Sequence, residues 1–572
     1  CIIETRMRRK YLKPKIVVNP EIVDLPTDCS HWVVDTETNG LDVVGDKAPH
    51  TASYLGACPT NDLDTIYIWT PINNEVRRFF DDKVVVGHNI KFDVHAADLS
   101  PTAVFDTMLA VYHAHTTALK SLDFVARTMA IGKIPTPQLM KEGRIHEIPL
   151  TTVAAYLADD VAVTGVLFNK LWSSGQRGWD MHHKLSMAVQ RMEARGVKFV
   201  PEEFDALVPL VNNEVSKAMT RLKGYGFEGN LNSPIQVGEW LTQVRGLKIE
   251  STPKSIEKGN PKPKTDKLTL EKLLWKGHLE IDALLQARRM IKLQQAFLNT
   301  MKDKVRSSTG CVYANVHIAR TRTGRFSYSE PNLQQVPKHS ELGKRLRFCF
   351  SSPTGGLVSV ADYSQVEMRV AAGLSGEPVL LEAFDKGEDI HLQVAAKVLN
   401  KSPEQVGEEE RFGAKAINFG ILNGMGAKRL SHELRSDVAT AQRWLDDYQA
   451  GLPILTDWMN DIWAKAELNR VVKTLSGRTR VYLKEESVRS AISVVVQGTA
   501  ADIMAAALVA CDEADLAPLL VVHDEVVAST TDCDKLVFTM EQAANSLFPE
   551  QLGAVRFDAD GYTANTWGGE YV

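Results

Sequence analysis

The segment LVVHDEVVAS, residues 520–529, places two acids between two runs of strand-forming residues. One run ends at Val522 and the other begins at Val526, so Asp524 and Glu525 are expected at the tip of a hairpin. Acids favour turns, and taken alone this segment is a plain turn about as often as it is a metal site. Its meaning therefore depends on the rest of the chain.

A third acid follows another short strand. The segment GLVSVADYSQVEMRVAAGLSGE, residues 356–377, predicts a strand through Val358 and Val360 that brings Asp362 to its end. An amphipathic helix is expected from about Ser364. Because two carboxylates at two strand ends can share a pair of divalent cations, these acids are candidate metal ligands.

Between the two acidic segments lies RFGAKAINFGILNG, residues 411–424. A helix here would align Arg411, Lys415 and Phe419 at successive i,i+4 positions on one face. The two cationic side chains on that face suit a triphosphate, and the aromatic ring suits a sugar or base. By itself, a basic RxxxK face is better interpreted as a solvated surface.

Together the three segments resemble motifs A, B and C of the family A DNA polymerases, which include bacterial DNA polymerase I and many phage replicative enzymes. The resemblance implies that Asp362 and Asp524 bridge two metals, with a carbonyl ligand from Tyr363 and a lesser role for Glu525. Two metals would stabilise charge on the attacking and leaving oxygens of phosphoryl transfer. The expected cofactor is Mg²⁺, two ions per active site, with Mn²⁺ as a substitute.

Further residues gain a role only through this resemblance. Arg411 and Lys415 would clamp the β- and γ-phosphates, and Lys415 would also protonate the departing pyrophosphate. In TRTGRFSYSEPNLQQVP, residues 321–337, Arg325 would reach the minor groove at the primer end, where it can test pairing without reading sequence. Glu367 would lie under the incoming sugar and exclude a 2′-hydroxyl. The remaining expected DNA or nucleotide contacts are Gln365, His391, Phe419, Asn423, Asn332, Gln334, Arg489, Gln497 and His523.

Two positions depart from the family pattern. The fingers helix usually carries FGxxYG, and here the Tyr position is Asn423. Another helix usually has Asn where this chain has Ser493. Neither change affects a metal ligand, so we expect altered fidelity or lesion tolerance with polymerisation retained.

The first third of the chain carries a second set of acids in three segments. HWVVDTETNGL, residues 31–41, puts Asp35 and Glu37 on one side of an extended strand because their spacing is i,i+2. Asp93 follows in VVVGHNIKFDVHAADL, and YLADDVAVTGVLF sets Tyr156 and Asp160 one helical turn apart. This order resembles the DEDDy class of 3′–5′ exonucleases, in which four acids hold two metals and the Tyr orients the attacking water. Since every acid is present, active proofreading is expected.

The expected fold is a multidomain α/β and α+β protein. An RNase H-like exonuclease domain over residues 1–180 precedes a right-hand polymerase domain over 181–572. Within the latter we expect a thumb at about 181–307, a palm at about 308–375 and 486–572, and fingers at about 376–485. The Pro- and Lys-rich segment 251–269 reads as an exposed thumb loop that follows duplex phosphates or as a plain solvated linker. We expect no 5′ nuclease domain within the residues before Asp35.

Composition limits the partners. The net charge of −5 excludes a histone-like basic binder, so DNA affinity must come from local clefts. The seven cysteines show no zinc spacing, and no apolar stretch of membrane-spanning length or signal peptide is recognised. We expect a monomer in the cytoplasm, or in an organelle if the N-terminus was processed. Its expected partners are primer-template DNA and deoxynucleoside triphosphates, with no membrane and no identifiable processivity factor.

Two other functions remain open at this stage. A single-subunit RNA polymerase has related motifs, although Glu367 and Phe419 both speak against it. A non-catalytic DNA-binding relative would have no use for the acids and cations of two active sites. A primer-extension assay separates the three interpretations.

Overall fold

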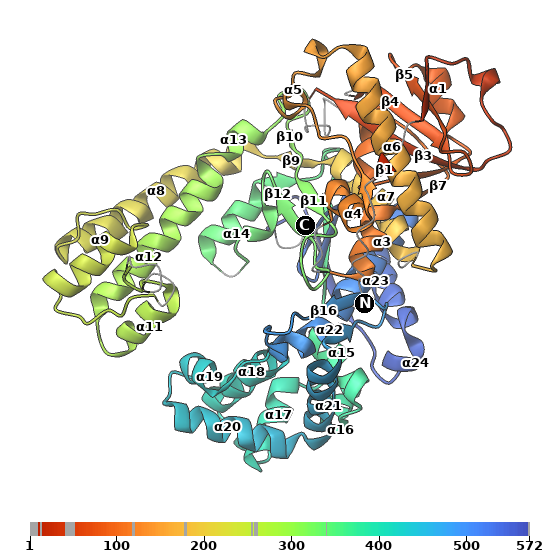
Figure 1. The fold of residues 1–572 in the computed structure, drawn as a ribbon. Coiled ribbons are helices and arrows are strands. Elements are labelled where there is room, and N and C mark those ends of the chain that lie inside the picture. Colours follow the sequence, from red (N-terminus) through yellow and green to blue (C-terminus); the bar gives the residue numbers. More distant parts are fainter. Residues whose placement is uncertain are drawn as a thin grey trace.

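The computed structural model describes residues 10–11, 14–39, 52–116, 120–176, 180–252, 256, 261–338 and 340–569. Figure 1 shows an α/β domain at one side of a central sheet, and two helical arms that extend from that centre. This arrangement agrees with the expected exonuclease domain and right-hand polymerase fold. The segments at 253–255 and 257–260, part of the expected thumb loop, lie outside the described residues.

The first domain is built on a six-stranded sheet in the order β2-β5-β4-β3-β6-β7. In its central strand, Trp32 and Val34 pack on one face and Val33 packs on the other, as the two-residue period of a strand requires. The strands of this domain are β1 Lys10–Tyr11, β2 Lys15–Val18, β3 His31–Thr38, β4 Ala52–Pro59, β5 Thr65–Trp69, β6 Val84–Gly87, β7 Ala103–Asp106 and β8 Ile131–Gly132.

Helices cover both faces of this sheet. The long helix α6 contributes Leu157 and Val161 to the core on the Val33 face. Tyr156 and Asp160 precede these two residues by one position each, so the same packing brings them near the sheet. The helical elements are η1 Ile22–Asp24, α1 Asn74–Phe79, α2 Lys91–Ala97, α3 Thr107–Ala114, α4 Leu122–Thr128, α5 Gln138–Lys141, η3 Ile145–Glu147, α6 Leu150–Ser173 and α7 Asp180–Arg195.

The palm is a four-stranded antiparallel sheet in the order β17-β18-β14-β19. Its strands are β14 Val358–Tyr363, β17 Pro518–Val522, β18 Glu525–Ala528 and β19 Ala559–Ala564. The expected strand–acid–helix order of the second motif is confirmed, because β14 ends one residue after Asp362 and α15 begins at Val366.

Helices and short strands surround this sheet. The helices are η6 Leu333–Gln335, α14 Glu341–Phe348, α15 Val366–Ser375, η8 Val488–Ser490, α22 Ala491–Glu513, α23 Cys533–Leu547 and α24 Pro549–Leu552. The short strands are β9 Val197–Phe199, β10 Cys311–Val312, β11 Asn315–His317, β12 Ser327–Ser329, β13 Phe350–Ser351, β15 Val471–Lys473 and β16 Thr479–Val481.

Two helices correct one sequence-based expectation. Leu150–Ser173 and Val488–Glu513 are long and apolar enough to cross a membrane by length and composition. In this fold they are core helices, because 72% and 89% of their most apolar windows are buried inside the protein. Their hydrophobicity therefore reflects packing against the two sheets.

The two arms of the polymerase domain are helical (Figure 1). The fingers consist of α16 Pro378–Asp385, α17 Ile390–Leu399, η7 Pro403–Gln405, α18 Glu408–Leu422, α19 Ala427–Glu433, α20 Val438–Gly451 and α21 Pro453–Asn469. The thumb consists of α8 Pro201–Gly224, α9 Pro234–Glu239, η4 Trp240–Val244, α11 Lys267–Trp275, α12 Leu279–Leu293, η5 Gln294–Leu298 and α13 Met301–Lys304. The expected thumb began near residue 181, but α7 packs against β7 and α22, so the helical arm starts with α8.

Helix α3 of the first domain packs into the main hydrophobic core of the polymerase domain. Leu109 and Tyr112 of α3 are fully buried together with residues of the palm. The Tyr112 hydroxyl donates a hydrogen bond to the backbone carbonyl of Thr321 at 3.0 Å, and the guanidinium of Arg478 lies 5.8 Å from its ring centre. The exonuclease fold is thus packed onto the segment that contains Arg325.

Candidate active sites

The acids of the expected polymerase motifs meet at one end of the palm sheet. Asp362 of β14 pairs across the sheet with Glu525, and Asp524 occupies the turn before β18. The backbone N–H of Tyr363 donates to the carbonyl of Asp524 at 3.0 Å, which ties this turn to β14. Burial raises the pKa of Asp524 to about 6, and the carboxylates of Glu367 and Asp362 add to the rise. A bound cation would relieve this repulsion.

Glu525 is held differently from the other two acids. It begins strand β18, whereas the sequence suggested the tip of the hairpin, and it is 4% exposed. A guanidinium nitrogen of Arg347 lies 3.1 Å from its carboxylate, and the indole N–H of Trp567 donates to it at 2.6 Å. Glu525 therefore anchors a buried network behind the site.

A cavity of about 320 Å³ adjoins these acids. Five residues that the sequence singled out from separate segments line it, and they are Arg325, Gln334, Gln497, His523 and Asp524. Loops, helix α22 and the palm hairpin all contribute to its wall. The fold thus brings the expected primer contacts next to one of the expected metal ligands.

Two of the expected substrate contacts pair with each other. Arg325 forms an ion pair with Glu367, which is 8% exposed at the start of α15. Gln365 precedes that helix in a left-handed conformation, with φ of 54°, and its side chain is exposed. Near η6, the side-chain oxygen of Asn332 is buried without a hydrogen-bond partner among the described residues. Of these groups, the exposed side chain of Gln365 is open to a ligand at the palm surface.

The fingers present the expected cationic face. Arg411, Lys415 and Phe419 are all exposed along α18, as their i,i+4 spacing predicts. Arg411 pairs with Asp389, with a nitrogen–oxygen distance of 2.5 Å. His391 is buried beneath this face, its ring centre 5.7 Å from that of Phe419, so its contact with a phosphate stays a prediction. Arg489 is exposed in η8, just before α22.

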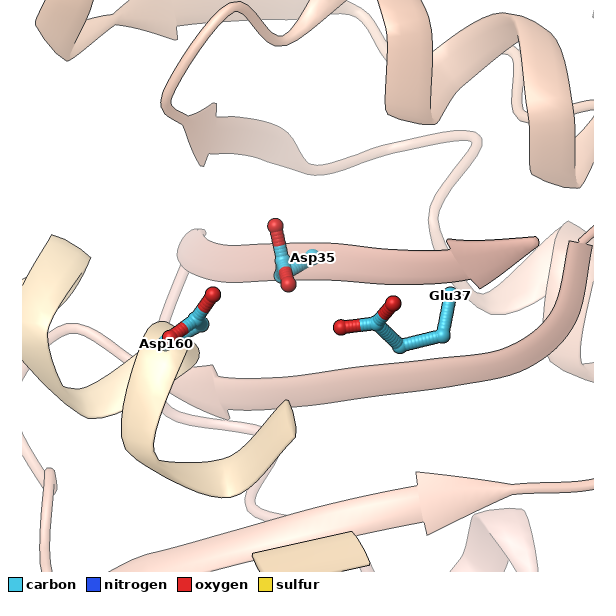
Figure 2. Close-up of side chains that lie close together, drawn as sticks. All are labelled: Asp35, Glu37 and Asp160. Carbon is cyan, nitrogen blue, oxygen red and sulfur yellow. The ribbon is translucent and has the colours of Figure 1, made fainter. Parts of the chain in front are cut away.

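The exonuclease acids form a compact cluster. Asp35 and Glu37 of β3 and Asp160 of α6 have ligand oxygens within 4.8 Å of one another, and Figure 2 shows the three carboxylates converging. Within the described ranges, this is the one group of three or more acids, histidines or cysteines that meets such a distance. Oxygen donors at this spacing suit a hard divalent cation.

The electrostatics of this cluster make it unfavourable for all three carboxyl groups to be ionised at once without a bound cation. Burial raises the pKa of Glu37 to about 8, and Asp160 and Asp93 add to the rise. Burial also raises the pKa of Asp160 to about 6, although Lys133 partly offsets the effect. The pKa of Asp35 rises for the same reasons, burial first and then its three acidic neighbours. Such a cluster binds protons or metal cations more readily than isolated acids do.

The fourth acid is oriented by the strand beside it. Asp93 is 4% exposed, and one of its oxygens accepts from both the backbone N–H and the hydroxyl of Thr36, at 2.9 and 2.8 Å. Thr36 lies between the two acids of β3. Asp93 is therefore fixed beside the cluster.

Residues 204–568, more than half of the chain, match the family model described as DNA polymerase family A. The chain belongs to DNA polymerase family A. Residues 21–176 match a model described as 3'-5' exonuclease, which agrees with the position of the second acidic cluster.

Relatives of this family A chain include DNA polymerase I of Pseudomonas aeruginosa. It is 29% identical over 582 residues, which cover 92% of this chain and 61% of the relative. The thermostable DNA polymerase I of Thermus filiformis is 36% identical over 368 residues, covering 61% of this chain and 43% of the relative. The chain thus spans less than two thirds of the length of these relatives.

A solved structure has the same fold. It is described as the POL domain of Pol1 from M. smegmatis in complex with DNA primer-template and dNTP. The TM-score is 0.78 at 23% identity, and the match covers 95% of this chain and 96% of that one.

The two departures from the family A pattern have defined surroundings. Asn423 follows the last residue of α18, and its side-chain amide donates to the carbonyl of Phe419 at 2.7 Å. Its side-chain oxygen accepts from Gln497 of α22, also at 2.7 Å. Asn423 thus joins the end of the fingers helix to a residue of the cavity wall. Ser493 lies half-buried in α22, one turn before Gln497.

Sequence reasoning missed two lysines in these family A sites. Lys133 lies 2.6 Å from Asp160 and 3.3 Å from the hydroxyl of Tyr156. Lys338 forms an ion pair with Asp362 and lies 3.6 Å from Glu525. Both residues are in loops that no periodicity describes, so the sequence gave no signal for them.

Proposed function

We propose that this family A chain is a DNA-directed DNA polymerase that extends a primer 3′-hydroxyl, with a 3′–5′ exonuclease that removes misinserted nucleotides. The observation that carries the proposal is the cavity where Arg325, Gln334, Gln497 and His523 adjoin Asp524. Relatives named DNA polymerase I, and a neighbour described with primer-template and dNTP, support these substrates.

The residues present fit divalent cations at both sites. In the polymerase site, Asp362, Asp524 and the carbonyl of Tyr363 would hold them. In the exonuclease site, the ligands would be Asp35, Glu37, Asp93 and Asp160. All of these donors are oxygens, and the mutual repulsion of buried carboxylates favours a cation between them. Bound Mg²⁺ supplies stabilisation of the charge that develops on the attacking and leaving oxygens.

In the polymerase site the protein positions the incoming nucleotide. Arg411 and Lys415 hold its phosphates from the exposed face of α18, and Arg411 exchanges part of its contact with Asp389 for the ligand. Phe419 packs against the sugar or base. Lys415 carries the proton that the departing pyrophosphate takes up.

Selection at the primer end falls to the Arg325–Glu367 pair. Glu367 occupies space beneath the sugar and excludes a 2′-hydroxyl, while Arg325 donates hydrogen bonds to the minor-groove acceptors that every correct pair presents. Because the two side chains share one ion pair, each fixes the orientation of the other. Gln497 completes this surface from α22.

In the exonuclease site Tyr156 orients the attacking water. Its hydroxyl lies 2.9 Å from that of Thr136 and 3.3 Å from Lys133, so two neighbours fix its direction. Burial raises the pKa of Tyr156, which keeps the hydroxyl protonated. Lys133 stabilises the arrangement through its ion pair with Asp160.

We also propose that the exonuclease domain ends near residue 180 and that the polymerase domain follows, with its thumb arm starting at α8. We further propose a monomer that acts on primer-template DNA with deoxynucleoside triphosphates. The cytoplasmic location stays a prediction. The type of metal follows the oxygen ligands, so Mg²⁺ with Mn²⁺ as a substitute is proposed at both sites.

The test is a labelled primer-template incubated with Mg²⁺, with and without deoxynucleotides. We expect extension in their presence and 3′ trimming in their absence. Asp524→Ala should abolish extension and leave trimming, and Asp35→Ala should do the reverse. Asp461→Ala, an exposed acid of α21, serves as the matched control. If Asp35→Ala left trimming intact, the exonuclease assignment would be wrong, and extension from ribonucleotides alone would indicate an RNA polymerase.

A further inference from the structure

The last turn of the fingers helix α18 is tied to the palm through a pair of side-chain amides. The amide of Asn423 donates to the backbone carbonyl of Phe419, and the amide of Gln497 donates to the side-chain oxygen of Asn423, each at 2.7 Å. Phe419 is 38% exposed on the cationic face of α18. Gln497 lies half-buried in α22 and lines the cavity that adjoins Asp524. We call this chain of two hydrogen bonds the amide relay.

The first hydrogen bond of the relay fixes the orientation of both amides. A backbone carbonyl only accepts, so the amide nitrogen of Asn423 faces Phe419 and its oxygen faces Gln497. That oxygen in turn requires the nitrogen of Gln497 on its side. Because an amide nitrogen carries two hydrogens, Gln497 has a second N–H that can donate into the cavity. The relay thus defines the direction of an amide that could otherwise present either its oxygen or its nitrogen to a ligand.

The backbone next to Asn423 supports the same junction. Gly424 has a φ of 69°, in the left-handed region that favours glycine. A β-carbon at Gly424 would lie 2.5 Å from the carbonyl oxygen of Arg489, a residue of η8 just before α22. The turn after α18 therefore packs directly on the segment that leads into α22. Close backbone packing at this point sets the position from which Asn423 reaches Gln497.

We propose that Asn423 is a positioning residue, which holds Gln497 ready to donate to the minor-groove acceptors of the terminal base pair. The inference rests on the proposed polymerase function and adds a residue to its test of pairing. Acceptors on purine N3 and pyrimidine O2 occupy similar places in every correct pair, whereas a mismatch displaces them. An amide that is not held would also point its oxygen at those acceptors, and the two would repel. The relay therefore favours extension from a correct pair over extension from a mismatch.

Single-turnover addition of the next correct nucleotide measures the effect of the relay. In the exonuclease-deficient Asp35→Ala background, Asn423→Ala should slow addition to a matched primer end by about tenfold, which is within the rotamer entropy that ordering one glutamine costs. Addition to a mismatched end should change little, so the preference for matched ends falls. Asn423→Asp, whose carboxylate can still accept from Gln497, should restore most of that preference. Gln442→Ala is the matched control, because this exposed amide on α20 donates within its own helix, to Asp446.

An altered base removes the acceptor without a change in the protein. A 3-deazapurine lacks the N3 acceptor, and it can be placed in turn on the primer strand and on the template strand of the terminal pair. On one of these strands it should slow the protein with Asn423 intact by the same factor as Asn423→Ala does. It should have no further effect on the Asn423→Ala variant. Gln497→Ala should likewise remove the effect of Asn423→Ala, as expected for two groups that act as one unit.

The outcomes separate the relay from the polymerase assignment. If Asn423→Ala slows matched and mismatched ends equally, Asn423 only supports the fold of the fingers and the inference is overturned. It is also overturned if the losses from Asn423→Ala and Gln497→Ala are additive, or if the 3-deazapurine slows the Asn423→Ala variant as much as the protein with Asn423 intact. A wild type that extends no primer made of natural bases would instead refute the proposed polymerase function.

Discussion

Replacing Glu525 by alanine tests whether this acid is an anchor or a metal ligand. Its carboxylate accepts from the Trp567 indole at 2.6 Å and pairs with Arg347, which is 5% exposed. The Arg347 guanidinium also lies 4.2 Å from the centre of the Trp567 ring. Glu525→Ala would leave a buried cation without this partner and a buried N–H without this acceptor.

The expected loss follows from that geometry. Removing one partner of a buried ion pair costs about 3–5 kcal/mol, because the remaining charge stays desolvated. Urea unfolding followed by tryptophan fluorescence should show this loss for Glu525→Ala. Glu341→Ala, an exposed acid on the same helix as Arg347, should stay within about 0.5 kcal/mol of wild type.

Activity supplies the second half of the test. At a temperature where the variant is folded, Glu525→Ala should still extend a primer, because Asp362 and Asp524 are intact. Unchanged stability together with lost Mg²⁺ binding, measured by calorimetry, would refute the anchor and make Glu525 a ligand. Glu525→Gln should recover part of the stability, since its amide oxygen can still accept from Trp567.

Three further expectations concern nucleotide choice and pH. Phe419→Tyr should relax discrimination against dideoxynucleotides by ~1.5–3 kcal/mol, because the new hydroxyl can replace the missing 3′-hydroxyl as a hydrogen-bonding partner; an unchanged ratio of insertion efficiencies would argue against the placement of α18. In an exonuclease-deficient Asp35→Ala background, adding Asn423→Tyr should lower misinsertion, since an aromatic stack on the template base is worth ~1–3 kcal/mol; single-nucleotide insertion kinetics opposite each base would detect the change, and equal or greater misinsertion would contradict it. The folded pKa of Glu37, about 8, lies above its unfolded value of 4.5, so the fold binds an extra proton between those values and the metal-free protein should lose stability as pH rises through this window. Calorimetric scans should show that loss and its reversal by Mg²⁺, and a stability that rises over the same pH range would exclude the raised pKa.

Local spacing predicted those parts of the sites that depend on one element. Asp35 and Glu37 share a side of β3 because side chains alternate along a strand, and Arg411, Lys415 and Phe419 share a face of α18 because of the helical period. The family resemblance supplied the relation between these elements, and the family models agree with it.

Pairings across loops could not be predicted in this way. Lys133 reaches Asp160, and Lys338 reaches Asp362, from segments without regular structure. The pairing of Arg325 with Glu367 depends on how a loop crosses the palm. Long flexible side chains reach in many directions, so their partners become defined only when the backbone is folded.

The two apolar helices show a related limit. The helix that contains Tyr156 and the one that contains Gln497 pass a hydropathy test for membrane spans. A helix that is apolar on all sides fits either lipid or the interior of a large protein. The sheets on which these helices pack decide between the two.

The contact of Tyr112 with Thr321 limits how the domain organisation of this protein can change in evolution. A lineage that no longer needs proofreading cannot simply delete the gene segment for the first domain, because the deletion would remove Leu109 and Tyr112 and uncover the palm residues packed on them. A single codon change such as Asp35→Asn would remove the proposed nuclease chemistry and leave that packing untouched. We therefore expect proofreading-deficient descendants of this chain to retain the first domain in an inactive form. Its metal-binding carboxylates would be substituted, and Tyr112 would be unaltered.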